Sequence, residues 1–99
     1  MIPKEIYYSE IKKVYQNLSP YVIKTPIIQN SSYLNNLFNT NIFFKLEFLQ
    51  HSGCFKVRGA INNLLNLSEN EKEKGITAVS AGNHAIATSY VANKFSIKN

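Results

Sequence analysis

The first part of the chain has apolar residues at helical spacing. Four of them follow the pattern i, i+3, i+4, i+7, which places them on one face of a helix: Ile11, Val14, Tyr15 and Leu18. Ser9 stands where an N-cap would stand, and Ser19-Pro20 ends the pattern because the residue before a proline avoids the helical conformation. We therefore expect an amphipathic helix that ends before Pro20.

The next stretch of the chain alternates between extended and helical patterns. Residues 21–29 are expected to be extended, with a bend at Thr25-Pro26. Ser31 or Ser32 is in position to begin a short helix, and the polar run Asn39-Thr40-Asn41 closes it.

From residue 42 onward, strand patterns alternate with helix patterns. Residues 42–46 form a nearly continuous apolar run, which predicts a mostly buried strand, and a helix with an apolar face follows over 57–65. The charged run 69–74 is expected to be a solvated face that ends at Gly75. Residues 76–79 predict a second strand, which leads into a last helix.

The order of these elements predicts an α/β fold. Strands that alternate with helices favour a layered architecture with parallel pairing, in which both faces of the sheet are covered. The chain stops at Asn99, after a helix, where an alternating fold would supply its next strand. We therefore expect residues 1–99 to be one N-terminal portion of a larger catalytic domain that has been truncated.

Composition excludes several classes of protein. The 99 residues are 44% hydrophobic, but no apolar run approaches the roughly 20 residues that span a bilayer, and no signal peptide is apparent. The single cysteine, Cys54, cannot form an internal disulfide, which suits a reducing cytoplasm. Because no apolar run is long enough, we expect no membrane partner. The net charge of +5 comes from scattered lysines with one arginine, Arg58, so we expect no nucleic-acid partner either.

One loop places a lysine at the beginning of a helix. In Gly53–Ala60, with the sequence GCFKVRGA, Lys56 falls in the first helical turn beyond a glycine turn. Lysine is usually placed elsewhere because the N-terminal end of the helix dipole is positive, and that field favours an uncharged, nucleophilic amine. Taken by itself, the motif is more typical of a surface lysine near a turn.

A second loop has the composition of an anion site. Ser80–Ala85, with the sequence SAGNHA, joins a predicted strand to a helix through small residues, so that backbone N–H groups can hold an anion. Asn83 adds an amide that can hydrogen-bond a ligand oxygen. Taken by itself, this loop is more typical of an ordinary turn between a strand and a helix, capped by Ser80 or Asn83.

Together the motifs resemble those of a known enzyme family. The chain is similar, in the order and spacing of its motifs, to threonine/serine dehydratases, and Thr25-Pro26 matches the Thr-Pro step of that family. Three separated motifs carry the resemblance: Lys45–Gln50 (KLEFLQ), Gly53–Ala60 and Ser80–Ala85. The resemblance implies the tryptophan synthase β-like fold (fold type II), a partial three-layer parallel-sheet fold, with pyridoxal 5'-phosphate (PLP) as cofactor.

The same resemblance implies roles for individual residues. Lys56 would form the Schiff base with PLP and, once displaced by the substrate amine, would take the proton from Cα. Phe55 would pack near the cofactor, and Asn83 would hydrogen-bond its phenolic oxygen. The carboxylate of the substrate would be held by one loop: Ser80, Ala81, Gly82, Asn83 and His84.

The implied reaction is the deamination of L-threonine or L-serine by β-elimination. Such a reaction belongs to amino-acid metabolism and, in particular, to isoleucine biosynthesis. Val57 and His84 match the dehydratase branch rather than the cysteine synthase branch. Serine racemases usually carry a second serine as a base, whereas this chain has Ala81, whose methyl group cannot move a proton. We therefore expect elimination rather than racemisation.

Two other interpretations compete with this one. His51, Cys54 and His84 would need a fourth ligand or water to form a metal site, and ligand counting disfavours one, so no metal is expected. A non-catalytic role is the stronger rival, either as a truncated remnant or as one half of a split enzyme. The expected partners are thus an amino-acid substrate and a complementing chain or a second copy of the same chain.

Overall fold

The computed structural model describes residues 5–99, which form five α-helices and two short strands. In chain order they are α1 (Tyr8–Leu18), β1 (Ile27–Gln29), α2 (Ser32–Phe38), β2 (Phe43–Lys45), α3 (Lys56–Leu65), α4 (Glu69–Lys74) and α5 (Asn83–Lys94). Two 3-10 turns, η1 (Glu47–Leu49) and η2 (His51–Gly53), lie between β2 and α3. α2 begins at Ser32, one of the two predicted starts, and ends at Asn39 as predicted. The charged run ends at Gly75, also as predicted.

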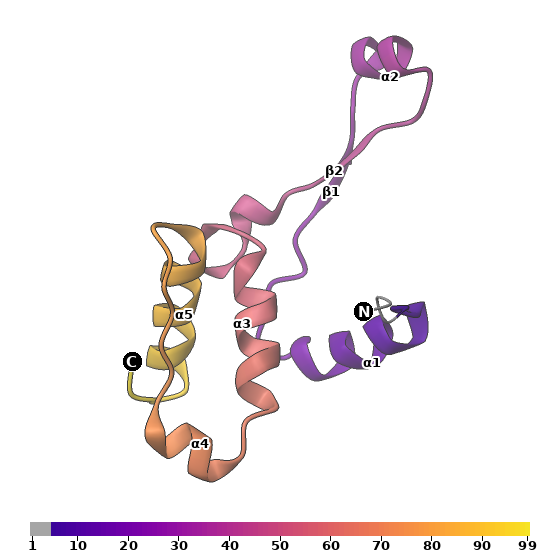
Figure 1. Ribbon diagram of the computed structural model, residues 1–99. Helices are drawn as coiled ribbons and strands as arrows, with labels where there is room; N and C mark the ends of the chain where they lie inside the picture. Colours follow the sequence, from indigo (N-terminus) through magenta and orange to yellow (C-terminus); the bar gives the residue numbers. More distant parts are fainter. Residues whose placement is uncertain (1–4) are drawn as a thin grey trace.

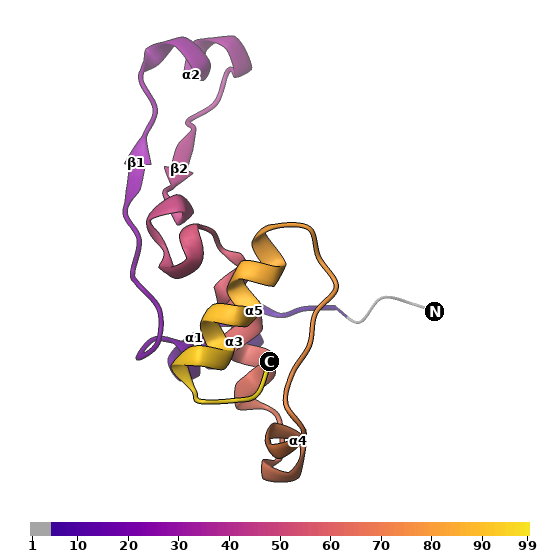
Figure 2. The same ribbon diagram turned by 90° about the vertical axis from the view of Figure 1, so that its left-hand side faces the viewer.

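The core lies between α3 and α5. The two helices run side by side in the same direction (Figures 1 and 2), and each contributes a fully buried branched side chain, Ile61 and Val91. Val57 and Leu64 extend the buried face of α3 at the helical spacing that the sequence predicted. Leu18, at the end of α1, completes the cluster.

Helix α1 contacts the core with its last two turns, through the buried Leu18 and the half-buried Val14. It begins at Tyr8, with Tyr7 in the capping position, so the predicted cap at Ser9 is wrong by two residues. The carboxylate of Glu10 accepts the Tyr7 N–H at 3.2 Å and supplies the cap instead. Of the predicted apolar face, Leu18 is buried, whereas Ile11 remains 55% exposed.

The strands form an arm that projects from the helices. β1 and β2 pair antiparallel, with Ile28 opposite Phe44, and α2 lies at the tip between them (Figure 1). We call residues 27–45 the arm. The prediction of a mostly buried strand in parallel pairing is wrong here, since every residue of both strands is exposed. The reason is that, within residues 5–99, the sheet has only two strands and no helix packs against it.

Residues 76–79 do not form the second strand that was predicted. The segment connects α4 to α5 without a ladder partner among the described residues, and Val79 is fully exposed. It is fixed at its beginning, where the Ile76 N–H donates to the Lys98 carbonyl oxygen at 2.8 Å. A strand pattern alone is insufficient because a strand exists only when a neighbour accepts its hydrogen bonds.

The predicted solvated run 69–74 is a helix of its own. α4 begins with a capping box, in which the side chain of Ser68 accepts the Glu71 N–H and the carboxylate of Glu71 accepts the Ser68 N–H. An ion pair of 2.7 Å between Lys72 and Glu69 lies on its surface. The other charged residues of the run are exposed, as the pattern indicated, whereas Lys72 is half-buried.

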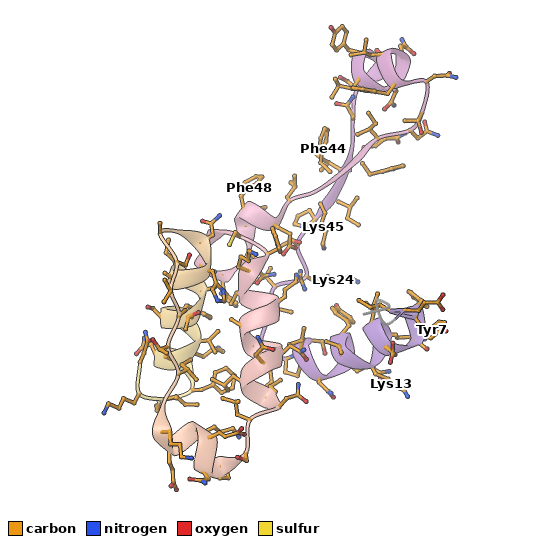
Figure 3. The ribbon with its side chains drawn as sticks, viewed as in Figure 1. Tyr7, Lys13, Lys24, Phe44, Lys45 and Phe48 are labelled. Carbon is orange, nitrogen blue, oxygen red and sulfur yellow. The ribbon has the colours of Figure 1, made fainter. Side chains whose placement is uncertain are left out.

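The molecule is elongated. It measures 53 × 30 × 28 Å, and its radius of gyration is 16.7 Å, against about 13 Å for an ordinary domain of this length. The arm accounts for the difference: Figure 3 shows Phe44 on the arm and Phe48 near its base, and both side chains are exposed. Among residues 5–99, no helix is long and apolar enough to cross a membrane.

Candidate functional site

We call the packed helices α1, α3 and α5 the helical body. The two loops singled out in the sequence lie at the same end of it. Lys56 is the first residue of α3, and Asn83 is the first residue of α5. Because the two helices run in the same direction, both N-termini are found at one end (Figures 1 and 2). The structure therefore brings together a lysine and a second helix N-terminus that are separated by 27 positions in the sequence.

The loop that leads into Lys56, residues 51–55, makes a sharp reversal before α3 begins, and we call it the lysine loop. Ser52 and Gly53 both adopt positive φ angles, 62° and 73°, which turn the chain back toward the helices. Cys54 is buried, whereas Phe55 and Lys56 are exposed. The Lys56 Nζ lies 5.3 Å from the centre of the Phe55 ring, so the two predicted cofactor residues are in contact.

The second loop leaves backbone donors available. The Gly82 N–H donates to the Ser80 Oγ at 3.2 Å, and the Ile86 N–H donates to the Gly82 carbonyl oxygen at 3.1 Å. The N–H groups of Asn83 and His84 belong to the first turn of α5, where no intrahelical acceptor exists. Residues 80–84 are all exposed, so an anion has free access to these donors.

The three candidate metal ligands have different surroundings. His51 stacks on Tyr90 of α5, with ring centres 5.2 Å apart and an interplanar angle of 15°. His84 is exposed and borders a shallow hollow between α3 and α5, whose lining includes Thr88. Within residues 5–99, no group of three His, Cys, Asp or Glu side chains is placed to hold a metal ion.

A polar cluster next to the lysine loop was missed by the sequence reasoning. Arg58 donates twice to Glu47, from Nε to Oε2 and from Nη2 to Oε1, each at 2.8 Å, and the Thr25 hydroxyl donates to the same carboxylate. Gln50 is 4% exposed and bonds both backbone groups of Ile23 with its amide. We call Thr25, Glu47, Gln50 and Arg58 the polar clamp.

The clamp changes the acidity of its carboxyl group. The hydrogen bonds from Arg58, helped by Thr25 and by the charges of Arg58 and Lys45, lower the pKa of Glu47 to about 2. The same pairing raises the pKa of Arg58. Glu47 and Arg58 both belong to the sequence motifs described above. Because the two residues are 11 positions apart, the periodicity of the sequence could not predict their contact.

The chain matches one protein family and several solved structures. Residues 18–99 match the family model described as pyridoxal-phosphate dependent enzyme. Serine racemase of Dictyostelium discoideum is 39% identical over 89 residues, which cover 90% of this chain and 27% of that protein. Its crystal structure has a TM-score of 0.81 over 91% of this chain and 29% of that one.

Dehydratases stand among the similar proteins as well. The biosynthetic L-threonine dehydratase of Staphylococcus epidermidis is 44% identical over 89 residues, covering 90% of this chain and 21% of that protein. The crystal structure of a threonine deaminase from T.th. has 33% identity and a TM-score of 0.76, covering 94% of this chain and 32% of that one. The likeness to these structures confirms the predicted fold class, of which this chain forms a part. The chain spans roughly a quarter of the length of these curated relatives.

Proposed function

This chain belongs to the family of pyridoxal-phosphate dependent enzymes, and on that premise we propose that it serves the deamination of L-threonine or L-serine. The products would be a 2-oxo acid and ammonia, and Lys56 would be the catalytic residue. The observation that carries the proposal is that α3, which begins with Lys56, and α5, which begins with Asn83, have their N-termini at the same end (Figure 1). Competence would require the remainder of the fold that the longer relatives possess.

The exposed groups at this end fit the cofactor of the family. PLP presents an aldehyde, a phenolic oxygen and an aromatic ring, which call for an amine, a hydrogen-bond donor and an apolar contact. Lys56 supplies the amine, Asn83 has an amide at the start of α5, and the ring of Phe55 lies beside the lysine Nζ. When bound, PLP supplies the electron sink that stabilises negative charge at Cα.

The chain's own residues would bind the substrate and move a proton. The N–H groups at the start of α5 would hold the substrate carboxylate, because that helix end is positive and its donors are free of intrahelical acceptors. The amine of Lys56 would take the proton from Cα. Departure of the β-hydroxyl as water leaves an enamine, which water converts to the 2-oxo acid and ammonia.

Elimination is favoured over racemisation by one side chain. Racemisation needs a second base that delivers a proton to the opposite face of Cα. The loop carries Ala81 beside Ser80, and a methyl group can neither accept nor donate that proton. This argument supports the dehydratase reaction even though a serine racemase is among the similar proteins.

A second candidate function is a non-catalytic one. The arm exposes Phe43, Phe44 and Leu37, and an exposed group of large apolar side chains is typical of an association surface. As one half of a split enzyme or as a remnant, the chain would act as an association module for a complementing chain or a second copy. The free, buried Cys54 supports a reducing compartment, the cytoplasm, in either case.

The test is a titration of the purified chain with PLP, followed by borohydride reduction and peptide mass mapping. We expect weak binding with the pyridoxyl group on Lys56 above all other lysines, and no useful turnover of L-threonine. Lys56→Ala is the control and should lose the preferred adduct. Labelling spread evenly over the surface lysines would contradict the proposed role of Lys56. Ammonia release from L-threonine that disappears in Lys56→Ala would contradict the expected inactivity of the chain.

A further inference from the structure

The polar clamp connects four separate parts of the chain beside the lysine loop. Arg58 lies in the first turn of α3, Glu47 opens η1, Gln50 lies between the two 3-10 turns, and Thr25 lies before β1. The side chains of Arg58 and Glu47 are 24% and 16% exposed, and Thr25 is 3% exposed. The two parallel bonds between guanidinium and carboxylate fix an orientation as well as a distance.

The clamp closes the loop that carries Lys56. Between Glu47 and Arg58 the backbone passes through Ser52 and Gly53, which both have positive φ angles. Lys56 lies on this segment, two residues before Arg58. An ion pair at the ends of such a loop reduces the conformations open to it, because the ends can no longer separate. The Arg58 N–H also donates to the Phe55 carbonyl oxygen at 3.0 Å, which ties the first turn of α3 to the residue before the lysine.

Further bonds hold the other side of the clamp in place. The Lys45 Nζ donates to the Thr25 carbonyl oxygen at 2.6 Å, and Figure 3 shows Lys45 at the base of the arm. The Arg58 Nη2 donates to the Ile23 carbonyl oxygen at 3.3 Å. The carboxylate of Glu47 therefore faces three groups that prefer its charged form, namely Arg58, Thr25 and Lys45.

The charges have a particular relation to α3. A cation in the first helical turn is unfavourable because the N-terminal end of the helix dipole is positive. Arg58 occupies that position, and the Glu47 carboxylate offsets both the guanidinium and the dipole. Without Glu47, the guanidinium would be repelled from the turn and would move toward water, and the lysine loop would lose its anchor.

We propose that the ion pair between Glu47 and Arg58 is the positioning element for Lys56, which holds the first turn of α3 so that the amine keeps one direction. The proposal rests on the proposed function of Lys56. Glu47 and Arg58 are positioning residues, since they act through the loop and not on the reacting atoms.

The first experiment compares adduct formation between variants of the 99-residue chain. Each is treated with PLP and borohydride, and the pyridoxyl yield at Lys56 is divided by that at the exposed Lys13. Glu47→Gln should lower this ratio by about tenfold, since small misplacements of a reacting group have large effects on rate. Arg58→Lys keeps the positive charge but cannot form both parallel bonds to Glu47, and it should lower the ratio by less than Glu47→Gln does.

Two controls separate positioning from general destabilisation. Glu69→Gln breaks the surface ion pair of α4 and should leave the ratio unchanged. Ile61→Val loosens the core without touching the clamp and should lower the thermal midpoint while leaving the ratio within about twofold. A ratio that Glu47→Gln leaves unchanged, in a chain that prefers Lys56, would overturn the proposal.

A second measurement distinguishes failure of the inference from failure of the proposed function. If the unaltered chain shows no preference for Lys56, the proposed function fails, and amide hydrogen exchange of the peptide 52–58 decides the inference. Exchange there should be about tenfold faster in Glu47→Gln than in Glu69→Gln. Equal exchange would overturn the positioning role. If Glu47→Gln does not fold by circular dichroism, Thr25→Val, which removes one bond to Glu47, is measured in its place against the same two criteria.

Discussion

Glu47 shows how one carboxylate can make stability depend on pH. Its pKa falls from the ordinary value of 4.5 to about 2 in the folded chain, chiefly through the hydrogen bonds from Arg58. Because the folded-state pKa is the lower one, the ionised group stabilises the fold above about pH 4.5, and this contribution is lost as the pH falls toward about 2.

Replacing this group should therefore weaken the fold in a pH-dependent way. Glu47→Gln should lower the free energy of unfolding by on the order of 1–2 kcal/mol at pH 7, a figure that allows for screening by solvent. The difference from the unaltered chain should shrink between pH 4.5 and pH 2. Urea unfolding at several pH values measures it, with Glu69→Gln as the control that changes little. A difference that stays constant over this range would show that the pairing does not set the acidity of Glu47.

Two glycines should respond to the same substitution with opposite signs. Gly75 has a φ of 89°, and a Cβ there would lie 2.7 Å from the Lys98 carbonyl oxygen, so Gly75→Ala should destabilise by about 1–3 kcal/mol. Gly59 lies within α3, where a Cβ would meet nothing within 4 Å. Gly59→Ala should stabilise by roughly 0.5–1 kcal/mol. Thermal unfolding of both variants checks the pair, and equal effects would contradict the described contact at Gly75.

At the scale of elements, the pairing of α3 with α5 determines whether the chain folds. Ile61 and Val91 are fully buried between them. Ile61→Ala should cost about 2–5 kcal/mol, and Ile61→Val about 0.5–1.5 kcal/mol. Because a chain of this size has little stability to spare, the alanine variant should be largely unfolded at 25 °C by far-UV circular dichroism. An alanine variant as stable as the valine variant would mean that the core lies elsewhere.

Helices were predictable from the sequence, and strands were less so. The buried face of α3 follows from apolar spacing, and the end of α1 follows from Pro20, since both are local properties of the chain. The state of residues 42–46 and 76–79 depends on which segments lie beside them, and their patterns contain no such information. The strand at 43–45 exists but is exposed, and residues 76–79 have no ladder partner among the described residues.

The candidate site also has a part that the sequence could predict and a part that it could not. Lys56 and Asn83 could be found from short motifs, and the structure places both at one end of the helical body. The contact between Arg58 and Glu47 forms across the sharp reversal of the chain at Ser52 and Gly53. Such a pair is a property of three-dimensional arrangement, so no spacing rule could have indicated it.

At the scale of the whole molecule, the elongated shape and exposed apolar arm should make the chain associate. Sedimentation velocity should show a coefficient that rises with concentration, because contact between arms removes apolar surface from water. The double variant Phe38→Ser with Phe43→Ser should reduce this dependence, because both exposed rings belong to the arm. Tyr8→Ser, which removes an even more exposed aromatic ring from α1, is the control and should leave the concentration dependence unchanged. A concentration dependence that persists in the double variant would place the contact outside the arm.

The base of the arm has one more consequence. The Leu46 N–H donates to the Pro26 carbonyl oxygen at 3.0 Å, so the chain returns to the helical body beside the point at which it left. The two residues that flank the arm, Pro26 and Leu46, are therefore neighbours in space, so a short loop could replace residues 27–45. None of these residues belongs to the buried cluster of α1, α3 and α5. Insertions and deletions at the tip leave this arrangement intact, since the tip lies far from the base (Figure 2). The length of the arm can thus vary in evolution without any change in the packing of the helices.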